Sequence, residues 1–305
     1  MTFEWGQRTY VMGIINATPD SFSGDGVAAA PEPGARGDSE TEAIAARAVE
    51  QARRFLADGA DILDVGGEST RPGSVPVTTE EEVARVVPVV RALRSAFGEA
   101  TISVDTYRAA VAAAALAAGA DWINDVWGLR MDPDMAALAA ERGCPVVIMH
   151  NRSKPKDVAQ EQRLGGRYVG IRYGDLLGDI ARELTEQMEI AFAAGVREER
   201  IILDPGVGFG KTVEQNVELL DRLRELKSLG RPLLIGPSRK SFIGYTLDLP
   251  PDDRVEGTAA AVAIGIDRGA DIVRVHDVRA IARVARMTDR IVRRAAPAQP
   301  GGAPP

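Results

Sequence analysis

Short apolar runs rich in Val and Ile alternate along the chain with longer segments of helical periodicity. This alternation is typical of repeated β-α units that build a buried parallel sheet. Eight apolar runs can be counted, and they are Tyr10–Ile15, Asp61–Val65, Thr101–Val104, Trp122–Asn124, Pro145–Met149, Arg200–Leu203, Pro232–Ile235 and Asp271–Val275. Eight strands alternating with helices predict an α/β fold, a single-domain (β/α)₈ TIM barrel.

The triplet Gly-Ala-Asp supports these units. It recurs at Gly59, Gly119 and Gly269, each time after a helical segment and directly before an apolar run. Glycine can adopt the left-handed conformation that ends a helix. Each copy therefore predicts a helix end followed by a strand.

Two long segments interrupt the alternation. Asp20–Ser39 is rich in Gly, Ala and Pro, and Asn151–Gly174 is basic and non-periodic. We expect both to be long loops, the second following the fifth strand on the face where barrels usually carry function. The barrel domain is predicted to span residues 1–294, and the Pro-rich segment 295–305 is expected to be disordered and dispensable for chemistry.

Every apolar run ends in a polar or ionisable side chain. In order, these are Asn16, Asp64, Asp105, Asn124, His150, Asp204, Ser238 with Lys240, and Arg274 with His276. In a barrel, side chains at the carboxyl ends of strands are catalytic or bind ligands. Any one of them could instead be a helix cap or a buried structural group. The whole set favours a site, and it favours the barrel over a doubly wound sheet, which the strand count alone leaves open.

These side chains divide into two chemical sets. The cations that follow the last two strands, where barrels often bind phosphate, are Arg239, Lys240, Arg274 and His276. The helix after Asp277 would add its N-terminal N–H groups. The residues that can accept hydrogen bonds from the N–H groups of a flat, nitrogen-rich ring are Asp105, Asn124 and Asp204. We therefore expect a small ligand that combines phosphate with ring nitrogens.

Some of these residues also have a structural interpretation. Asp64 precedes Gly66, Gly67 and Glu68, and its carboxylate could accept hydrogen bonds from their backbone N–H groups. The chain's two histidines, His150 and His276, lack the close spacing of zinc ligands, and His150 alone could be structural. The segment Asp204–Lys211 resembles a glycine-rich phosphate loop without the Walker spacing, which is a weak signal by itself.

Composition narrows the function classes. The net charge is −7 with a pI near 5.1, and no segment concentrates Lys and Arg, which argues against nucleic acid as a partner. A lone cysteine, Cys144, excludes an intrachain disulfide and a cysteine metal cluster and fits a reducing cytoplasm. We expect no membrane segment, because no basic-then-apolar signal opens the chain and the Ala-rich run ends at Gly119.

The strand-end segments, taken in order, resemble dihydropteroate synthase, a pterin-binding TIM-barrel family of folate biosynthesis. The matching stretches are Asn16–Ser23, Asp64–Gly73, Ser103–Thr106, Ile123–Asp125, Asp204–Gly210, Ser238–Ser241 and Arg274–Asp277. They span nearly the whole chain, and the first two are long and specific. The resemblance implies a transferase that joins p-aminobenzoate to 6-hydroxymethyl-7,8-dihydropterin pyrophosphate, forming 7,8-dihydropteroate and pyrophosphate with the help of Mg²⁺.

The resemblance also implies a role for each matching residue. The pterin would be held by Asp105, Asn124, Asp204 and Lys240, with Asp64 and Ser238 also lining the substrate site. The diphosphate would meet Arg274 and His276, and Asn16 would ligate magnesium. The p-aminobenzoate site would be shaped by Thr70, Arg71, Phe209, Lys240 and Ser241. The catalytic set would be Lys240, Arg274, His276, Asp20 and Arg71, with the loops 20–23 and 69–73 closing over the substrates. Members of the family are usually dimeric, and the amphipathic segment Val278–Arg293 could form a homodimer contact.

The chain departs from the family pattern in two places. Ser23 is followed by Gly24-Asp25-Gly26, which shifts the aspartate of the first loop by one position, and Asn151-Arg152 follows His150 where an apolar residue is expected. Three alternatives stay open. They are a corrinoid-linked methyltetrahydrofolate methyltransferase, a Schiff-base aldolase using Lys240, and a catalytically silent pterin-binding paralogue.

Overall fold

The computed structural model describes residues 3–18, 38–68, 77–154, 158–159, 161–169 and 171–294. Within these residues, eight parallel strands form one sheet in the order β8-β5-β4-β3-β2-β1-β10-β9. The strands are β1 (Tyr10–Asn16), β2 (Ile62–Gly66), β3 (Thr101–Asp105), β4 (Trp122–Asp125), β5 (Val146–Met149), β8 (Ile201–Asp204), β9 (Leu234–Ile235) and β10 (Ile272–Val275). A parallel bridge between Leu203 and Leu233 joins the two edges of the sheet. The predicted single-domain TIM barrel is confirmed.

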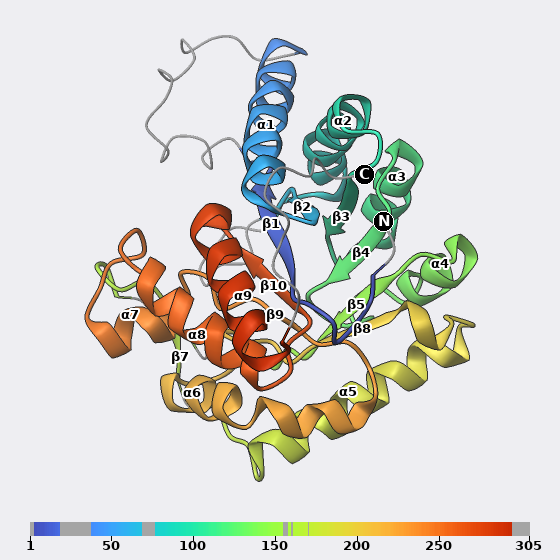
Figure 1. The fold of residues 1–305 in the computed structure, drawn as a ribbon. Coiled ribbons are helices and arrows are strands. Elements are labelled where there is room, and N and C mark those ends of the chain that lie inside the picture. Colours follow the sequence, from blue (N-terminus) through green and yellow to red (C-terminus); the bar gives the residue numbers. More distant parts are fainter. Residues whose placement is uncertain are drawn as a thin grey trace.

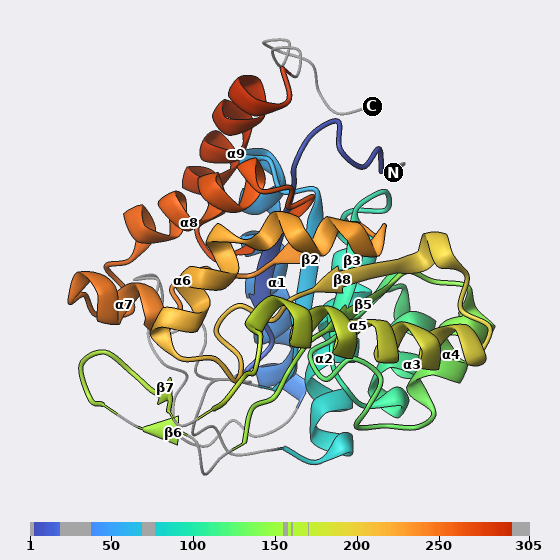
Figure 2. The same cartoon turned by 90° about the horizontal axis from the view of Figure 1, so that it is seen from below.

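Helices follow the strands and surround the barrel (Figures 1 and 2). They are α1 (Asp38–Asp58), α2 (Thr79–Ala96), α3 (Ala109–Ala118), α4 (Met135–Arg142), α5 (Leu176–Ala193), α6 (Val213–Asp221), α7 (Ser241–Leu247), α8 (Val255–Asp267) and α9 (Val278–Val292), with 3-10 turns η3 (Glu198–Arg200) and η4 (Leu223–Leu229). As the sequence predicts, Gly59, Gly119 and Gly269 follow α1, α3 and α8 with φ of 104°, 116° and 104°. Only glycine adopts this conformation without strain, so the repeated triplet sets three helix ends.

Strand residues alternate between the outer core, under the helices, and the barrel interior. The lower interior layer is apolar and is formed by Tyr10, Met12, Ile62, Trp122, Val147, Ile202, Leu234 and Ile272. Two positions further along four of these strands, the same inward face carries Asp64, Asn124, Asp204 and Arg274. The barrel therefore has an apolar floor and a polar layer above it, toward the carboxyl ends of the strands.

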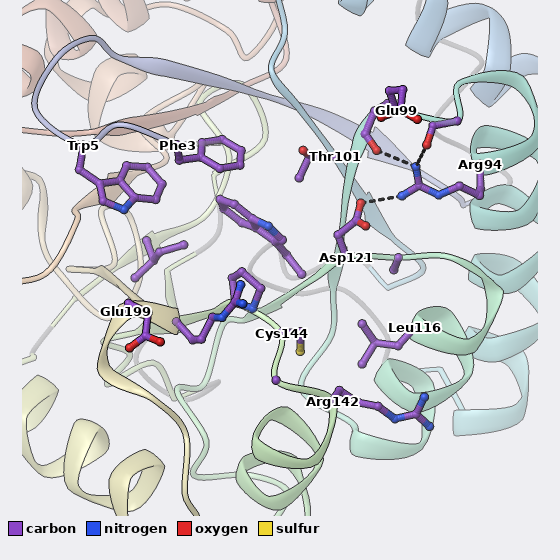
Figure 3. A pocket seen from close by; sticks show the side chains of 18 residues that line it. Phe3, Trp5, Arg94, Glu99, Thr101, Leu116, Asp121, Arg142, Cys144 and Glu199 are labelled. Carbon is purple, nitrogen blue, oxygen red and sulfur yellow. Dashed lines mark hydrogen bonds and ion pairs between the residues drawn. The ribbon is translucent and has the colours of Figure 1, made fainter. Parts of the chain in front are cut away.

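The amino ends of the strands are covered by the N-terminal segment. Phe3 packs on Trp5 and on Trp122, with ring centroids 5.3 and 4.8 Å apart. A cavity of about 890 Å³ lies beside them, where Arg94 Nη2 is 2.6 Å from Asp121 Oδ2 (Figure 3). None of the strand-end site residues predicted from the sequence lines this cavity, which lies at the opposite end of the barrel.

The long segments differ in part from expectation. The segment Asn151–Gly174 contains a short antiparallel pair, β6 (Val158–Ala159) and β7 (Arg167–Tyr168), so the prediction of a plain loop was wrong there. Strands of two residues are too short to show a period in the sequence. Figure 2 shows this pair at the end of the barrel opposite the N-terminal segment.

Other segments lie partly outside the description. Helix α1 already includes Asp38, so the end of the predicted loop Asp20–Ser39 is helical, while most of that loop lies outside the described residues, as does 295–305. Among the described helices, none combines the length and apolar character needed to span a membrane.

Candidate active site

An arginine and two carboxylates occupy the centre of the polar layer. Arg274 Nε, from β10, donates to Asp64 Oδ2 on β2 at 2.6 Å, and Arg274 Nη2 donates to Asp105 Oδ2 on β3 at 2.5 Å. Asn124 Nδ2, from β4, donates to the same Asp64 oxygen at 3.1 Å. Closure of the barrel brings these residues together, because β10 lies beside β1 and faces β2 to β4 across the interior.

The structure corrects the expected role of Asp64. In its structural interpretation the carboxylate would accept hydrogen bonds from the backbone N–H groups of Gly66 to Glu68, whereas it accepts them across the barrel from Arg274 and Asn124. Strand alternation turns Asp64 into the interior, away from the backbone that follows it. The side chain is fully buried, and among the described residues neither its Oδ1 nor Ser103 Oγ, opposite it on β3, has a hydrogen-bond partner. Buried polar atoms without a partner are rare, so the site offers unused hydrogen-bonding capacity.

Asp105 titrates abnormally because of this environment. Burial raises its pKa to about 7, since the opposing effect of Arg274 is offset by the nearby charge of Asp64. One guanidinium shared by two buried carboxylates cannot fully stabilise both negative charges. Asp105 is thus poised to change its protonation state near neutral pH.

Asp204 ends β8 on the same inward face. Its Oδ1 accepts the N–H of Gly206 at 2.7 Å, and burial raises its pKa to about 6 against the opposing effects of that bond and of Lys211. The side chain is 6% exposed. Asp204 therefore caps the loop that follows it and also belongs to the polar layer.

Ser238 and His276 are coupled at the ends of β9 and β10. Ser238 Oγ lies 3.0 Å from His276 Nδ1 and accepts the backbone N–H of His276 at 3.1 Å. Arg239 adopts a positive φ of 56° and donates two hydrogen bonds to Asp277, at 2.9 and 2.6 Å. Arg239, which the sequence grouped with the phosphate-binding cations, is thus bonded to a carboxylate.

The loops after β8 and β9 meet through Lys240 and Phe209. Lys240 Nζ lies 3.8 Å from the centroid of the Phe209 ring, a cation-π contact. Ser241 follows as the first residue of α7. An aromatic face and a cation are therefore presented side by side at the rim.

Asn16 ends β1 beside Gly66 and is half-buried. Its side chain makes no hydrogen bond to another described residue, which leaves its amide oxygen available as a ligand. Over the part of the chain that the structure describes, no three His, Cys, Asp or Glu residues converge as a metal cluster. Three predicted site residues, Asp20, Thr70 and Arg71, lie outside the described residues.

Sequence reasoning missed several buried residues that support the site without lining it. Lys211, 1% exposed, donates to His150 Nδ1, and His150 Nε2 lies 3.0 Å from Glu183 Oε2. Lys211 stands in the weak glycine-rich loop signal, whereas Glu183 looks like any solvated acid on an amphipathic helix. The structural interpretation of His150 is the one that the contacts support.

A second cluster lies next to the rim at β2 and β3. Arg108 bonds both Glu68 and the buried Glu82, and its Nη2 donates to Val77 O at 2.9 Å. These contacts join the residues on either side of the segment 69–76. No pattern in the sequence marks this cluster.

Comparisons with known proteins agree with this geometry. The family described as pterin binding enzyme matches residues 12–276. Dihydropteroate synthase of Clostridium beijerinckii is 48% identical over 293 residues, which cover 96% of this chain and 97% of the relative. A solved dihydropteroate synthase from Clostridium difficile, crystallised in the presence of pteroic acid, is 44% identical with a TM-score of 0.82, covering 96% of this chain and 100% of that one.

A third comparison bears on the second substrate. The Xanthomonas albilineans dihydropteroate synthase solved with 4-aminobenzoic acid is 39% identical, with a TM-score of 0.79, covering 96% of this chain and 95% of that one. The likeness extends over nearly the full length of every chain compared. The chain belongs to the pterin-binding enzyme family and, within it, to the dihydropteroate synthases, the transferases of folate biosynthesis.

Proposed function

We propose that the polar layer and rim of this barrel condense p-aminobenzoate with 6-hydroxymethyl-7,8-dihydropterin pyrophosphate, giving 7,8-dihydropteroate and pyrophosphate. The observation that carries the proposal is the buried cluster of Asp64, Asp105 and Asn124 around Arg274, where two buried oxygens have no partner within the part of the chain that the structure describes. A nitrogen-rich ring supplies the N–H donors that such oxygens lack. The related structures with pteroic acid and 4-aminobenzoic acid support the same ligand classes.

The pterin would lie in the polar layer against Asp105, Asn124 and Asp204. Each presents an oxygen on the inward face, and all three are less than 10% exposed. Hydrogen bonds from ring N–H and amino groups to buried carboxylates are charge-assisted and therefore orient the ring firmly. The apolar floor closes the barrel beneath this layer, so the ring would enter from the rim.

The diphosphate would extend from the ring toward β10 and α9. Arg274 Nη1 makes no hydrogen bond to the described residues, whereas its Nε and Nη2 are engaged by Asp64 and Asp105. His276, held by Ser238, adds a second donor, and the N-terminus of α9 favours negative charge. These groups stabilise the charge that develops on the leaving pyrophosphate.

Magnesium fits this arrangement through Asn16 and the diphosphate oxygens. Mg²⁺ usually takes only one or two oxygen ligands from the protein and the rest from phosphates and water. The amide oxygen of Asn16 at the end of β1, which bonds none of the described residues, meets that requirement. When bound, the ion would neutralise negative charge on the departing pyrophosphate.

p-Aminobenzoate would bind at the rim between Phe209, Lys240 and Ser241. The aryl ring suits the aromatic face and the carboxylate suits the lysine. Its amine forms a C–N bond to the pterin methylene carbon while the C–O bond to pyrophosphate breaks, and the amine then loses a proton to solvent. The proposal includes Thr70, Arg71 and Asp20 at this site, on the strength of the resemblance alone.

Assembly and location complete the proposal. Exposed apolar side chains gather on α8 and α9, where Ile264, Met287 and Ile291 are 46, 62 and 65% exposed. Apolar groups of this size that face water favour a partner surface, and we assign it to a homodimer. The domain is taken to span residues 1–294, and the lone buried Cys144 fits a cytoplasmic location.

A turnover assay tests this function. Pterin diphosphate, p-aminobenzoate and Mg²⁺ are expected to yield equal amounts of dihydropteroate and pyrophosphate, and neither product should form when p-aminobenzoate is omitted. A protein that binds pterin without turnover would be the silent paralogue. Methyl transfer from methyltetrahydrofolate to a corrinoid would identify the methyltransferase, and borohydride trapping of Lys240 with a carbonyl substrate would identify the aldolase.

A further inference from the structure

A buried lysine lies behind the loop Pro205–Gly210. Lys211 Nζ is 3.1 Å from His150 Nδ1, 3.0 Å from Gly206 O and 3.1 Å from Phe209 O. An ammonium group has three N–H donors, and here each one has an acceptor. Lys211 is therefore committed to the protein and does not extend toward a phosphate, which sets this loop apart from the glycine-rich phosphate loops it resembles.

The hydrogen bonds continue from Lys211 into helix α5, and we call the chain Lys211–His150–Glu183 the relay. Because His150 Nδ1 accepts from Lys211, the proton of the neutral ring lies on Nε2, which donates to Glu183 Oε2 at 3.0 Å. Glu183 also accepts from Arg152 Nε at 2.9 Å. These bonds hold the pKa of Glu183 below its usual range, although burial acts in the opposite direction.

A second branch reaches the same loop. The guanidinium of Arg152 lies 4.2 Å from the centroid of the Tyr173 ring, and Tyr173 Oη donates to Gly210 O at 2.9 Å. Three carbonyls of one loop, those of Gly206, Phe209 and Gly210, are thus fixed by side chains that lead back to Glu183. This accounts for Arg152, which departs from the apolar residue expected after His150.

The loop that is fixed in this way contacts both sides of the site. Its first turn is tied to Asp204 through the Gly206 N–H, and its far end places the Phe209 ring under Lys240 Nζ. At Gly208, φ is 79°, and an added Cβ would lie 2.7 Å from Lys240 Cδ. The loop therefore has little freedom to shift without moving the lysine of the rim.

We propose that Lys211, held in place by His150 and Glu183, is a positioning residue that sets the loop Pro205–Gly210 and with it the Phe209 face of the p-aminobenzoate site. The inference rests on the proposed function, because it assumes that Phe209 and Lys240 receive p-aminobenzoate. Lys211 touches neither substrate in this scheme and acts only through the loop.

The relay has a pH signature. Burial lowers the pKa of Lys211 to about 7, with Arg152 and Lys240 adding to this effect and Asp204 and Glu183 opposing it. Burial and the charge of Lys211 lower the pKa of His150 to about 4, so the ring is neutral at pH 7. Above its pKa, Lys211 keeps only two N–H donors for three acceptors. The KM for p-aminobenzoate should therefore rise as pH increases from about 6 to about 8.5.

The test compares Lys211→Met with Lys227→Met at saturating pterin diphosphate. Lys227 Nζ pairs with the buried Asp271 at 2.8 Å, near the amino ends of the strands, so this control removes an equal charge and perturbs the fold away from the site. Lys211→Met should raise the KM for p-aminobenzoate by about 10-fold with kcat changed less than about 3-fold. It should also abolish the pH step in KM and speed hydrogen exchange in residues 205–210. Lys227→Met should do none of these.

Glu183→Gln keeps the relay's shape and weakens it, and is the second variant if Lys211→Met does not fold. Its control is Glu186→Gln, since Glu186 is exposed on the same helix and pairs with Arg182. An unchanged KM in Lys211→Met and Glu183→Gln, or a pH step that persists without Lys211, would overturn the inference.

Phe209→Ala distinguishes an error in the assignment of the p-aminobenzoate site from an error in the proposed relay. If this variant leaves the KM for p-aminobenzoate unchanged, the assignment of the substrate site is wrong. If it raises KM while Lys211→Met does not, the site assignment holds and the relay fails. If both act, the double variant should resemble Phe209→Ala alone, because Lys211 acts through the loop that carries Phe209; additive effects would contradict the relay.

Discussion

Arg274 and Asp105 lie 169 residues apart in sequence, yet Arg274 Nη2 donates to Asp105 Oδ2 at 2.5 Å in the barrel interior. The same guanidinium also bonds Asp64, which is fully buried. One guanidinium thus pairs with two buried carboxylates. Much of the behaviour expected of this site follows from that imbalance of charge.

Removing the guanidinium should cost stability as well as activity. Arg274→Gln leaves Asp64 and Asp105 buried without a counter-charge, a change that typically destabilises by about 3–5 kcal/mol. Urea unfolding at about pH 8, above the pKa of Asp105, should show this loss, and the loss should shrink at acid pH as Asp105 protonates. The control is Arg279→Gln, whose side chain is 71% exposed and lies 4.0 Å from Asp58. Equal stability of the two variants would contradict the proposed charge balance.

The raised pKa of Asp105 predicts a pH dependence of folding. Because its pKa rises from 3.8 to about 7 on folding, the native state binds the proton more tightly than the unfolded chain. The stabilisation is complete below about pH 4 and is lost as pH rises through about 7. Asp105→Asn lacks this titrating proton, so its stability relative to wild type should increase by on the order of 4 kcal/mol between pH 4 and pH 8. Unfolding in guanidinium chloride at both pH values measures this change, and a stability difference between variant and wild type that is the same at both would refute it.

Asp204→Asn separates pterin recognition from loop capping. Asn can still accept the Gly206 N–H, so the melting temperature should stay close to wild type. It offers one acceptor and one donor where the carboxylate offers two acceptors. The mismatch leaves a ring N–H unpaired, which costs about 1–3 kcal/mol of binding free energy. Pterin diphosphate affinity should fall by at least ~10-fold in calorimetry.

Asp125→Asn is the matched control for Asp204→Asn. Asp125 Oδ1 and Oδ2 accept the N–H groups of Trp127 and Leu129, a purely structural cap. This variant should lose stability and keep pterin affinity. If Asp204→Asn behaves in the same way, Asp204 does not contact the pterin.

Metal dependence should centre on Asn16. Turnover is expected to require Mg²⁺, since a pyrophosphate leaves and the described site residues include no obvious acid beside it. Asn16→Ala should raise the Mg²⁺ concentration needed for half-maximal rate by at least ~10-fold, because losing even a residue that only supports a metal ligand typically costs about 10–100-fold in metal affinity. Full turnover of the wild type in excess chelator would exclude this role.

The sequence predicted the strands closely because each apolar run ends at a polar residue. Asn124 and Asp204 could be recognised by that pattern alone, and their grouping follows from barrel topology. The bond between Arg274 and the two aspartates could not, because it depends on which strands face one another across the closed barrel. The roles of Lys211 and Glu183 could not be predicted either, because no local sequence pattern indicates that a charged side chain is buried. The roles of Asn16, Phe209 and Ser241 came from the family resemblance rather than from any pattern.

Strand β9 has only two residues, and a single bridge between Leu203 and Leu233 joins its edge to β8. This is the weakest joint around the ring, and the two loops that present Phe209 and Lys240 lie on either side of it. A substrate held between those side chains would act as a staple across the joint. Substrate bound at the rim should therefore stabilise the whole barrel. Local opening, and with it hydrogen exchange, would slow even in strands whose residues the substrate does not contact.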